Sequence, residues 1–194
     1  HRLEQLVANA TPLQLNEWTP KIRKLELFDQ TRELPLGGVS KQLLRSLRDY
    51  VAFSHPDWTM ADFQAKYVKS VAVRFRCSLL NLMRVVLSDR VASQQSTVFV
   101  SHAWKYNNNR FLSCVVELKN CSERDFFWID AITVNQFHTH HKFEWWSQTF
   151  RECIKTCGRT VLILFRYTNP IPLTRAWCLF EIFCTHEAQN VFEI

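Results

Sequence analysis

The chain has 194 residues, a net charge of +6 and a hydrophobic fraction of 47%, a composition that excludes disorder and suits one globular domain, with or without an extension. Only three residues are glycine, and the motifs GxGxxG and GxxxxGK(S/T) are both absent, which excludes a Rossmann fingerprint and a P-loop. No apolar run approaches the roughly 18 residues of a membrane span, so we expect none.

The distribution of charge limits the possible binding partners, and the cysteines indicate the cellular compartment. Basic residues are spread along the chain without a dense run, so they permit a phosphate-bearing ligand but do not predict nucleic-acid binding. The seven cysteines are odd in number and lie mostly in apolar segments, which indicates reduced core thiols in a cytoplasmic protein. Because the chain begins at His1 instead of Met, we expect it to be a fragment of a longer protein.

Residues 1–92 are predicted to form a helical N-terminal extension. Three prolines and the ELPLGG break interrupt residues 1–38, so the pattern does not locate individual helices there. A helix with one apolar face then follows, which Ser40 can cap and which ends at about Phe53.

Two further helices complete this extension. Thr59 and Asp62 resemble a capping box, with Asp in place of Glu, and the apolar residues within 63–72 lie at helical spacing after it. The apolar segment 77–87 predicts another helix. The polar stretch 88–96 is predicted to be a linker into a different region.

From residue 97 the pattern changes to short apolar strands that alternate with helices. The predicted strands are 97–101, 125–130, 160–165 and the start of a fourth at 191–194. The predicted helices are 110–120, 144–157 (with Gly158 as its stop) and 175–189. This alternation indicates βαβ units, so we predict an α/β domain over 97–194 with a parallel sheet covered by helices on both faces. Because the chain stops at the fourth strand, we expect the C-terminal part of this domain to be truncated.

The residues after each predicted strand are the candidate ligand contacts, because open parallel sheets bind ligands at the carboxyl ends of their strands. The candidate substrate-binding residues are Ser101, His102, Ala103, Trp104, Asp130, Asn135, Trp177 and Cys178. The candidate catalytic residue is Glu181, the single acid in the apolar stretch TRAWCLFEIFCT. It lies one helical turn after Trp177 and shares its helix face, although a solvent-facing position is the alternative.

A histidine-rich loop and a tryptophan pair are open to a second interpretation. His138, His140 and His141 could suggest a metal site, but no carboxylate or cysteine stands at a familiar ligand spacing, so we expect a solvated loop and no metal. Trp145 and Trp146 head a predicted helix. We expect one of them in the core, whereas the other could stack on a base.

The cysteines also allow more than one interpretation. Cys153 and Cys157 are four residues apart on a predicted helix, and we expect them to be buried apolar side chains. Cys178 with His102 or His186 could imitate the pair of a thiol protease. Nothing in the local sequence supports an activated thiolate, so we do not expect one.

Four segments, in order along the chain, resemble a known family. They are TVFVSHAW, FFWIDAITVNQ, TVLILF and RAWCLFEI. Together they resemble the TIR (Toll/interleukin-1 receptor) domain superfamily, and within it a TIR-like subset with the signature FVSHAW…WID…NQ…RAWCLFE. The resemblance covers residues 97–194 and implies a flavodoxin-like parallel sheet.

Many TIR domains are NAD⁺ glycohydrolases (NADases) that cleave the bond between nicotinamide and ribose, in some cases cyclising the product, in signalling or innate immunity. Other TIR domains are non-catalytic modules that assemble signalling complexes. The resemblance implies NAD⁺ as a substrate and no cofactor. It also implies a homo-oligomer, because enzymatic TIR sites often need two subunits. The catalytic glutamate of the family's WCLxE motif corresponds to Glu181.

One carboxylate is chemically sufficient for this reaction, because it stabilises the oxocarbenium-like ribose that forms as nicotinamide leaves. We expect apolar neighbours to raise the pKa of Glu181. Trp104 or Trp177 could stack on a ring of the nucleotide, and backbone N–H groups around 101–104 could contact phosphate or ribose. The chain departs from plant TIR domains in two places: SHAWKY replaces an SFRGED-like stretch, and AITVNQFHTHH lacks the acidic, glycine-bearing character of the TIR BB loop.

Overall fold

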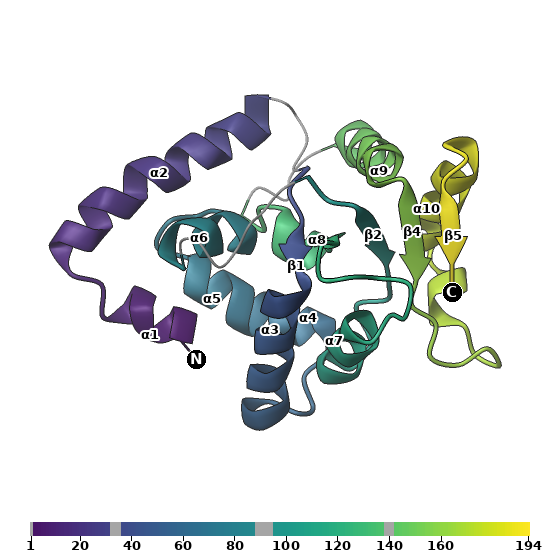
Figure 1. The fold of residues 1–194 in the computed structure, drawn as a ribbon, viewed down its shortest axis with the longest axis horizontal. Coiled ribbons are helices and arrows are strands. Elements are labelled where there is room, and N and C mark those ends of the chain that lie inside the picture. Colours follow the sequence, from purple (N-terminus) through teal and green to yellow (C-terminus); the bar gives the residue numbers. More distant parts are fainter. Residues whose placement is uncertain (1, 32–35, 88–94, 138–141) are drawn as a thin grey trace.

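A computed structural model describes residues 2–31, 36–87, 95–137 and 142–194. It contains a five-stranded sheet with the strand order β1-β3-β2-β4-β5. Figure 1 shows β1, β2, β4 and β5 of this sheet. The strands are β1 (Val39–Ser40), β2 (Val98–Ser101), β3 (Phe126–Trp128), β4 (Arg159–Leu162) and β5 (Val191–Glu193). Strands β2 to β5 are parallel, and β1 pairs antiparallel with β3 at one edge. The predicted parallel α/β sheet is therefore confirmed for four strands, and their order is compatible with a flavodoxin-like fold.

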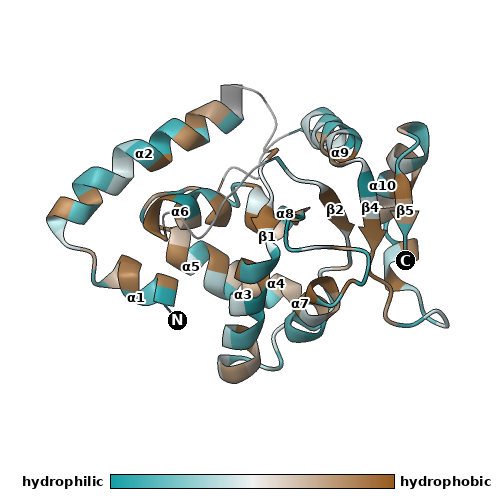
Figure 2. Cartoon of the chain, in the orientation of Figure 1, coloured by the Kyte–Doolittle hydropathy of each residue, from teal (hydrophilic) through white to brown (hydrophobic). Residues whose placement is uncertain are grey.

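Helices cover both faces of the sheet. They are α7 (Asn108–Val116) between β2 and β3, α8 (Asp130–Thr133) and α9 (Phe143–Cys157) between β3 and β4, and the 3₁₀ helix η3 (Ile171–Thr174) with α10 (Ala176–Glu187) between β4 and β5. Strand β2 is hydrophobic along most of its length (Figure 2), and its alternate residues serve the two faces. Val98 and Val100 join the core with Phe111 of α7. Phe99 packs on the other face against Phe150 of α9, with ring centroids 6.1 Å apart.

The described part of the N-terminal half is helical apart from β1. Its helices are α1 (Arg2–Ala8), α2 (Pro12–Thr31), α3 (Lys41–Ser54), α4 (Met60–Asp62), the π-helix η1 (Phe63–Val68), α5 (Lys69–Ala72) and α6 (Leu79–Val86). The sequence assigned residues 1–92 to a helical extension but located no individual helix in residues 1–38, where α1 and α2 lie. Helix α2 continues through Pro20, because an internal proline removes one main-chain hydrogen bond and can bend a helix without ending it. Among the described helices, none has the length and hydropathy that crossing a bilayer requires.

The predicted helix signals are confirmed at three places. The Leu43 backbone N–H donates to Ser40 Oγ at the start of α3. Thr59 and Asp62 form the reciprocal capping box at the start of α4. Gly158 ends α9 in the left-handed region, with φ of 72°. These signals are local, so the sequence alone defines them.

The N-terminal helices and the sheet share one hydrophobic core. A continuous cluster of buried side chains runs from Leu3 of α1 through Phe63 of η1 to Val100 of β2 and Ile163 after β4. Helix α3 packs against α7, and α6 packs against α8. The packing therefore does not divide at the expected linker 88–96, and β1 adds a strand of the extension to the sheet.

Strand β1 can approach β3 because a glycine precedes it. A Cβ atom on Gly38 would lie 2.8 Å from the Cβ of Phe126 and 3.0 Å from the Cα of Ser96. Real Cβ atoms do not approach neighbours this closely, so any side chain at this position would displace β1. Close packing, and not an unusual backbone angle, explains this glycine.

Candidate functional site

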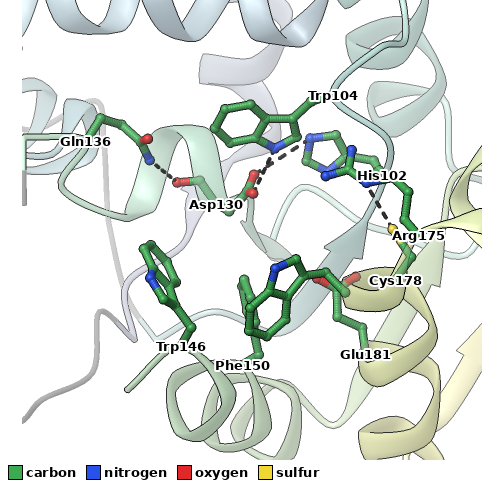
Figure 3. A pocket seen from close by; sticks show the side chains of 10 residues that line it. His102, Trp104, Asp130, Gln136, Trp146, Phe150, Arg175, Cys178 and Glu181 are labelled. Carbon is green, nitrogen blue, oxygen red and sulfur yellow. Dashed lines mark hydrogen bonds and ion pairs between the residues drawn. The ribbon is translucent and has the colours of Figure 1, made fainter. Parts of the chain in front are cut away.

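A pocket of about 250 Å³ opens at the carboxyl edge of the sheet (Figure 3). Two connections diverge here: α7 leads from β2 to β3 on one side, and α10 leads from β4 to β5 on the other. Such a divergence leaves a crevice between the two strand ends, where open α/β sheets bind ligands. The pocket is lined by His102, Trp104, Asp130, Gln136, Trp146, Phe150, Arg175, Trp177, Cys178 and Glu181.

Glu181 of α10 lies deep in this pocket, with only 8% of its surface exposed. Ser101 Oγ donates a hydrogen bond to Glu181 Oε2, which ties α10 to the end of β2. The contact follows from the pleat of β2, because Ser101 points to the same face as Phe99, toward α9 and α10. Glu181 Oε1 makes no hydrogen bond with any described residue, so this oxygen is available to a ligand.

The surroundings of Glu181 favour its protonated form. Burial raises the pKa of Glu181 to about 8; the hydrogen bond from Ser101 lowers it, the negative charge of Asp130 raises it and the positive charge of Arg175 lowers it. The carboxyl group is therefore mainly neutral at pH 7 in the protein alone, as its apolar neighbours led us to expect. A positive charge placed beside it would favour the ionised form.

Asp130 is a second carboxylate of the pocket, and two donors fix its orientation. The Trp104 indole Nε1–H donates to Asp130 Oδ2 at 2.8 Å, and the Ala131 backbone N–H donates to Oδ1 at 2.7 Å. Asp130 is the first residue of α8 and is separated from the end of β3 by Ile129 alone, which brings it to the same edge as the loop after β2. The Trp104 ring is thereby held against the pocket by a hydrogen bond at its polar end.

His102 places an unpaired ring nitrogen at the pocket. Its Nδ1 lies 3.3 Å from the Val100 carbonyl oxygen, which can only accept, so Nδ1 carries the hydrogen and Nε2 is an acceptor. Nε2 has no hydrogen-bond partner among the described residues, and Asp130 Oδ1 is 3.7 Å away. Burial lowers the pKa of His102 by more than the negative charge of Asp130 raises it. The ring is therefore neutral near pH 7.

Aromatic rings from two helices form one wall of the pocket. Phe150 of α9 contacts Trp177 of α10 edge to face, with ring centroids 5.2 Å apart. Trp146, one turn before Phe150, packs against it at 5.9 Å. Trp146, and not Trp145, lines this pocket. Such a wall suits a flat ring of a ligand.

The N-terminal extension holds the loop that follows β2. The Ala61 backbone N–H of α4 donates to the Trp104 carbonyl at 3.1 Å, and the Met60 N–H donates to the Tyr106 carbonyl at 2.9 Å. The backbone that carries His102 and Trp104 is therefore paired with the start of a helix from the extension.

The extension also holds the loop that follows β3. Gln64 of η1 donates through Nε2 to Gln136 Oε1 at 3.1 Å, and Gln136 Nε2 in turn donates to the Asp130 carbonyl at 2.9 Å. Asn135 Nδ2 donates to Glu26 Oε2 at 2.6 Å and to the Arg76 carbonyl at 2.8 Å. Asn135 thus faces the extension and does not line the pocket.

The structure brings together six of the residues that the sequence predicted for the site. They are His102, Trp104, Asp130, Trp177, Cys178 and Glu181. Ser101 lies beneath Glu181 with 1% exposure, and Ala103 is fully buried, so neither lines the pocket wall.

Three pocket residues were not named individually as candidates from the sequence. Gln136 stands next to Asn135 in the NQ pair, and Arg175 opens the RAWCLFE segment, so both were within the quoted motifs. Phe150 lies four residues after Trp146 on α9, and this helical spacing was the available indication.

Two alternatives from the sequence, a metal site and an activated thiol, can be compared with the described ranges of the chain. No group of three or more His, Cys, Asp or Glu in these ranges is arranged to hold a metal ion. His138, His140 and His141 lie outside the described residues. Burial raises the pKa of Cys178 to about 11, and its thiol contacts the His102 carbonyl instead of the ring.

Comparison with known proteins identifies no relative of this chain. No protein-family model, no curated protein and no solved structure matches the chain.

Proposed function

We propose that this chain is a TIR-like NAD⁺ glycohydrolase in which Glu181 stabilises the ribose cation. The supporting observation is the position of Glu181: a buried carboxyl group, oriented by Ser101, at the edge of a parallel sheet where ligands bind. This position agrees with the resemblance of RAWCLFEI to the WCLxE motif. The flavodoxin-like strand order agrees with it as well.

The chemistry follows from the pocket. The bond between the ribose C1′ and the nicotinamide nitrogen breaks, and nicotinamide leaves with the electron pair as a neutral molecule. Ionised Glu181 lies beside the resulting oxocarbenium-like ribose and stabilises its charge. Water then adds to C1′ and releases a proton to solvent, which gives ADP-ribose. The positive nicotinamide ring of bound NAD⁺ favours the ionised form of Glu181 against its raised pKa.

The aromatic wall of the pocket supports a ligand with a planar, positively charged ring. Trp146 and Phe150 line the α9 side of the pocket (Figure 3). Trp177 of α10 lines it as well. A nicotinamide ring stacked on this wall gains apolar contact and a cation–π attraction. Such contacts place the scissile bond near Glu181, which is one turn beyond Trp177 on the same helix.

The test is nicotinamide release from NAD⁺ by the wild type and by Glu181→Gln. We expect the variant to lose at least about 100-fold in kcat, because it keeps the shape of the side chain but cannot carry the charge. Glu187→Gln is the matched control, since Glu187 is exposed on the same helix and pairs with Arg151 at 3.5 Å. The assay is run over a range of protein concentrations, so that a site requiring two subunits is also sampled. Equal turnover by the wild type and Glu181→Gln would exclude the proposed role.

A non-catalytic assembly module is the second candidate function, and one observation favours it. Leu179 and Phe183 lie four residues apart on α10 and are 49% and 51% exposed. Such a pair suits self-association into a homo-oligomer. Sedimentation of Leu179→Glu and Phe183→Glu should then show weaker association than the wild type. NAD⁺ turnover by neither oligomer nor monomer, with association present, would favour this function over the enzyme.

The cytoplasm is the compartment that we propose. All seven cysteines are thiols, and most of them are buried. Reduced core thiols are typical of cytoplasmic proteins.

A further inference from the structure

Arg175 places a guanidinium group at the pocket. It is the residue before α10, is partly exposed and lines the pocket wall. Its guanidinium group makes no hydrogen bond or ion pair with any described residue, whereas Arg159 and Arg151 each pair with a glutamate. Arginine forms bidentate hydrogen bonds with phosphate more readily than any other side chain.

The same place offers backbone donors. No side chain caps α10, and the backbone N–H groups of Ala176 and Trp177 have no hydrogen-bond partner among the described residues. Helix α10 spans 12 residues, so its N-terminus carries the partial positive charge that attracts anions. Arg175 adds a full charge to that partial charge.

A buried and unpaired group beside this helix end points to a bound ligand. His102 has 3% of its side chain exposed, lines the pocket, and leaves its acceptor nitrogen Nε2 without a partner among the described residues. Its carbonyl oxygen accepts from the thiol of Cys178 in the first turn of α10. A buried acceptor of this kind is stabilised by a ligand hydroxyl group.

We propose that Arg175 and the N-terminus of α10 bind the phosphate group of a ribose 5′-phosphate, and that His102 Nε2 accepts a hydrogen bond from a hydroxyl group of the same nucleotide. This inference rests on the proposed function and specifies which residues of the pocket hold the phosphate group of the nucleotide.

The charges of the pocket support this orientation of the ligand. Glu181 and Asp130 supply the acidic groups, and Arg175 supplies the basic group. NAD⁺ carries a positive nicotinamide ring and a negative diphosphate. The acidic groups complement the ring, and the basic group complements the diphosphate.

The kinetic test compares two substrates that differ in their phosphate groups. Arg175→Gln should raise the KM for NAD⁺ by about 10- to 100-fold, the loss expected for charge-assisted hydrogen bonds. It should leave the KM for nicotinamide riboside, which lacks phosphate, unchanged. Arg175→Lys should recover part of the loss. Arg151→Gln, which removes an exposed arginine from α9, should change neither value. Equal loss for both substrates would overturn the inference.

A binding measurement separates this inference from the proposed activity. The probe is ADP-ribose, measured by calorimetry against the wild type, Arg175→Gln and Arg151→Gln. Tenfold or greater weakening by Arg175→Gln alone supports the phosphate subsite, even for a protein without turnover. No binding of ADP-ribose by the wild type, or equal binding by Arg175→Gln, overturns the subsite. Circular dichroism and thermal unfolding verify that each variant is folded.

Discussion

Ser101 and Glu181, 80 residues apart in the chain, are joined by a hydrogen bond from the serine hydroxyl group to the carboxyl oxygen Oε2. The bond connects the end of a central strand to the helix after the next strand in the sheet. It also lowers the pKa of Glu181, because a donor to a carboxylate favours the ionised form.

Ser101→Ala should move the pH dependence of activity to more alkaline values. Without the serine donor, the pKa of Glu181 rises, and the midpoint of the kcat/KM profile shifts upward by about one pH unit. Ser147→Ala on α9, whose hydroxyl group donates to the Glu144 carbonyl, serves as the control. A profile that stays in place or moves to lower pH would contradict this role of Ser101.

In the wild type, kcat/KM for NAD⁺ should rise with pH through about 8. The reason is that the pKa of Glu181 is raised to about 8 by burial, and only the ionised form stabilises the ribose cation. Glu181→Gln should abolish this rise in its residual activity. The steady-state rate of nicotinamide release between pH 5.5 and 9.5 is the measurement. A rate that stays level from about pH 5.5 to 9.5, as a pKa near the ordinary value of 4.5 requires, would show that burial does not control this group.

Protein stability should depend on pH in the opposite sense. The folded-state pKa of Glu181 lies above its ordinary value of 4.5, so folding binds a proton between the two values. The resulting stability is present below about 4.5 and is lost as the pH rises through about 8. The difference in unfolding temperature between wild type and Glu181→Gln should therefore become less favourable to the wild type from pH 5 to 8. The buried His102 is common to both proteins and cancels in this difference. A difference that stays constant over this range would refute the prediction.

Gln64 should act on the pocket through Gln136. Gln64→Leu removes the hydrogen bond that holds the loop after β3, and we expect kcat for NAD⁺ to fall by up to about tenfold. Gln42→Leu, at an exposed position of α3, is the control. In a Gln136→Leu background the same change should have little further effect, because the two side chains act as one unit. Independent losses from the two substitutions would argue against this connection.

Gly38→Ala should destabilise the fold by about 1–3 kcal/mol, the range for an overpacked site. The added methyl group would lie 2.8 Å from the Cβ of Phe126. Urea unfolding gives the free energy. Phe126→Gly removes that Cβ, so Gly38→Ala should cost less in this background. The same cost in both backgrounds would place the strain elsewhere.

The elements of the second half could be predicted because their signals are local. Strand β2 lies within the predicted 97–101, and Gly158 ends α9 as expected. Each signal consists of adjacent residues: a short apolar run for the strand, and a glycine that adopts a positive φ for the helix end. The edge of the sheet at which the candidate site lies could also be predicted, because open parallel sheets bind ligands at the carboxyl ends of their strands.

The rest of the site depends on contacts between distant residues. Gln64 and Gln136 are separated by 72 positions, and no local pattern links them. Asn135 and Gln136 are adjacent in the loop after α8, so the sequence could not determine which one faces the pocket. Strand β1 has two residues, too few for an alternating pattern.

The hydrogen bonds from α4 and η1 to both pocket loops make the N-terminal segment a reporter of ligand binding. A ligand that fixes Trp104 and Asp130 should also slow hydrogen–deuterium exchange at the amides of Met60 and Ala61, which donate to the loop after β2. The protection should extend along η1, although no residue of that helix lines the pocket. A fragment starting at residue 97 would lose this support, so its catalytic behaviour would not represent that of the intact fold.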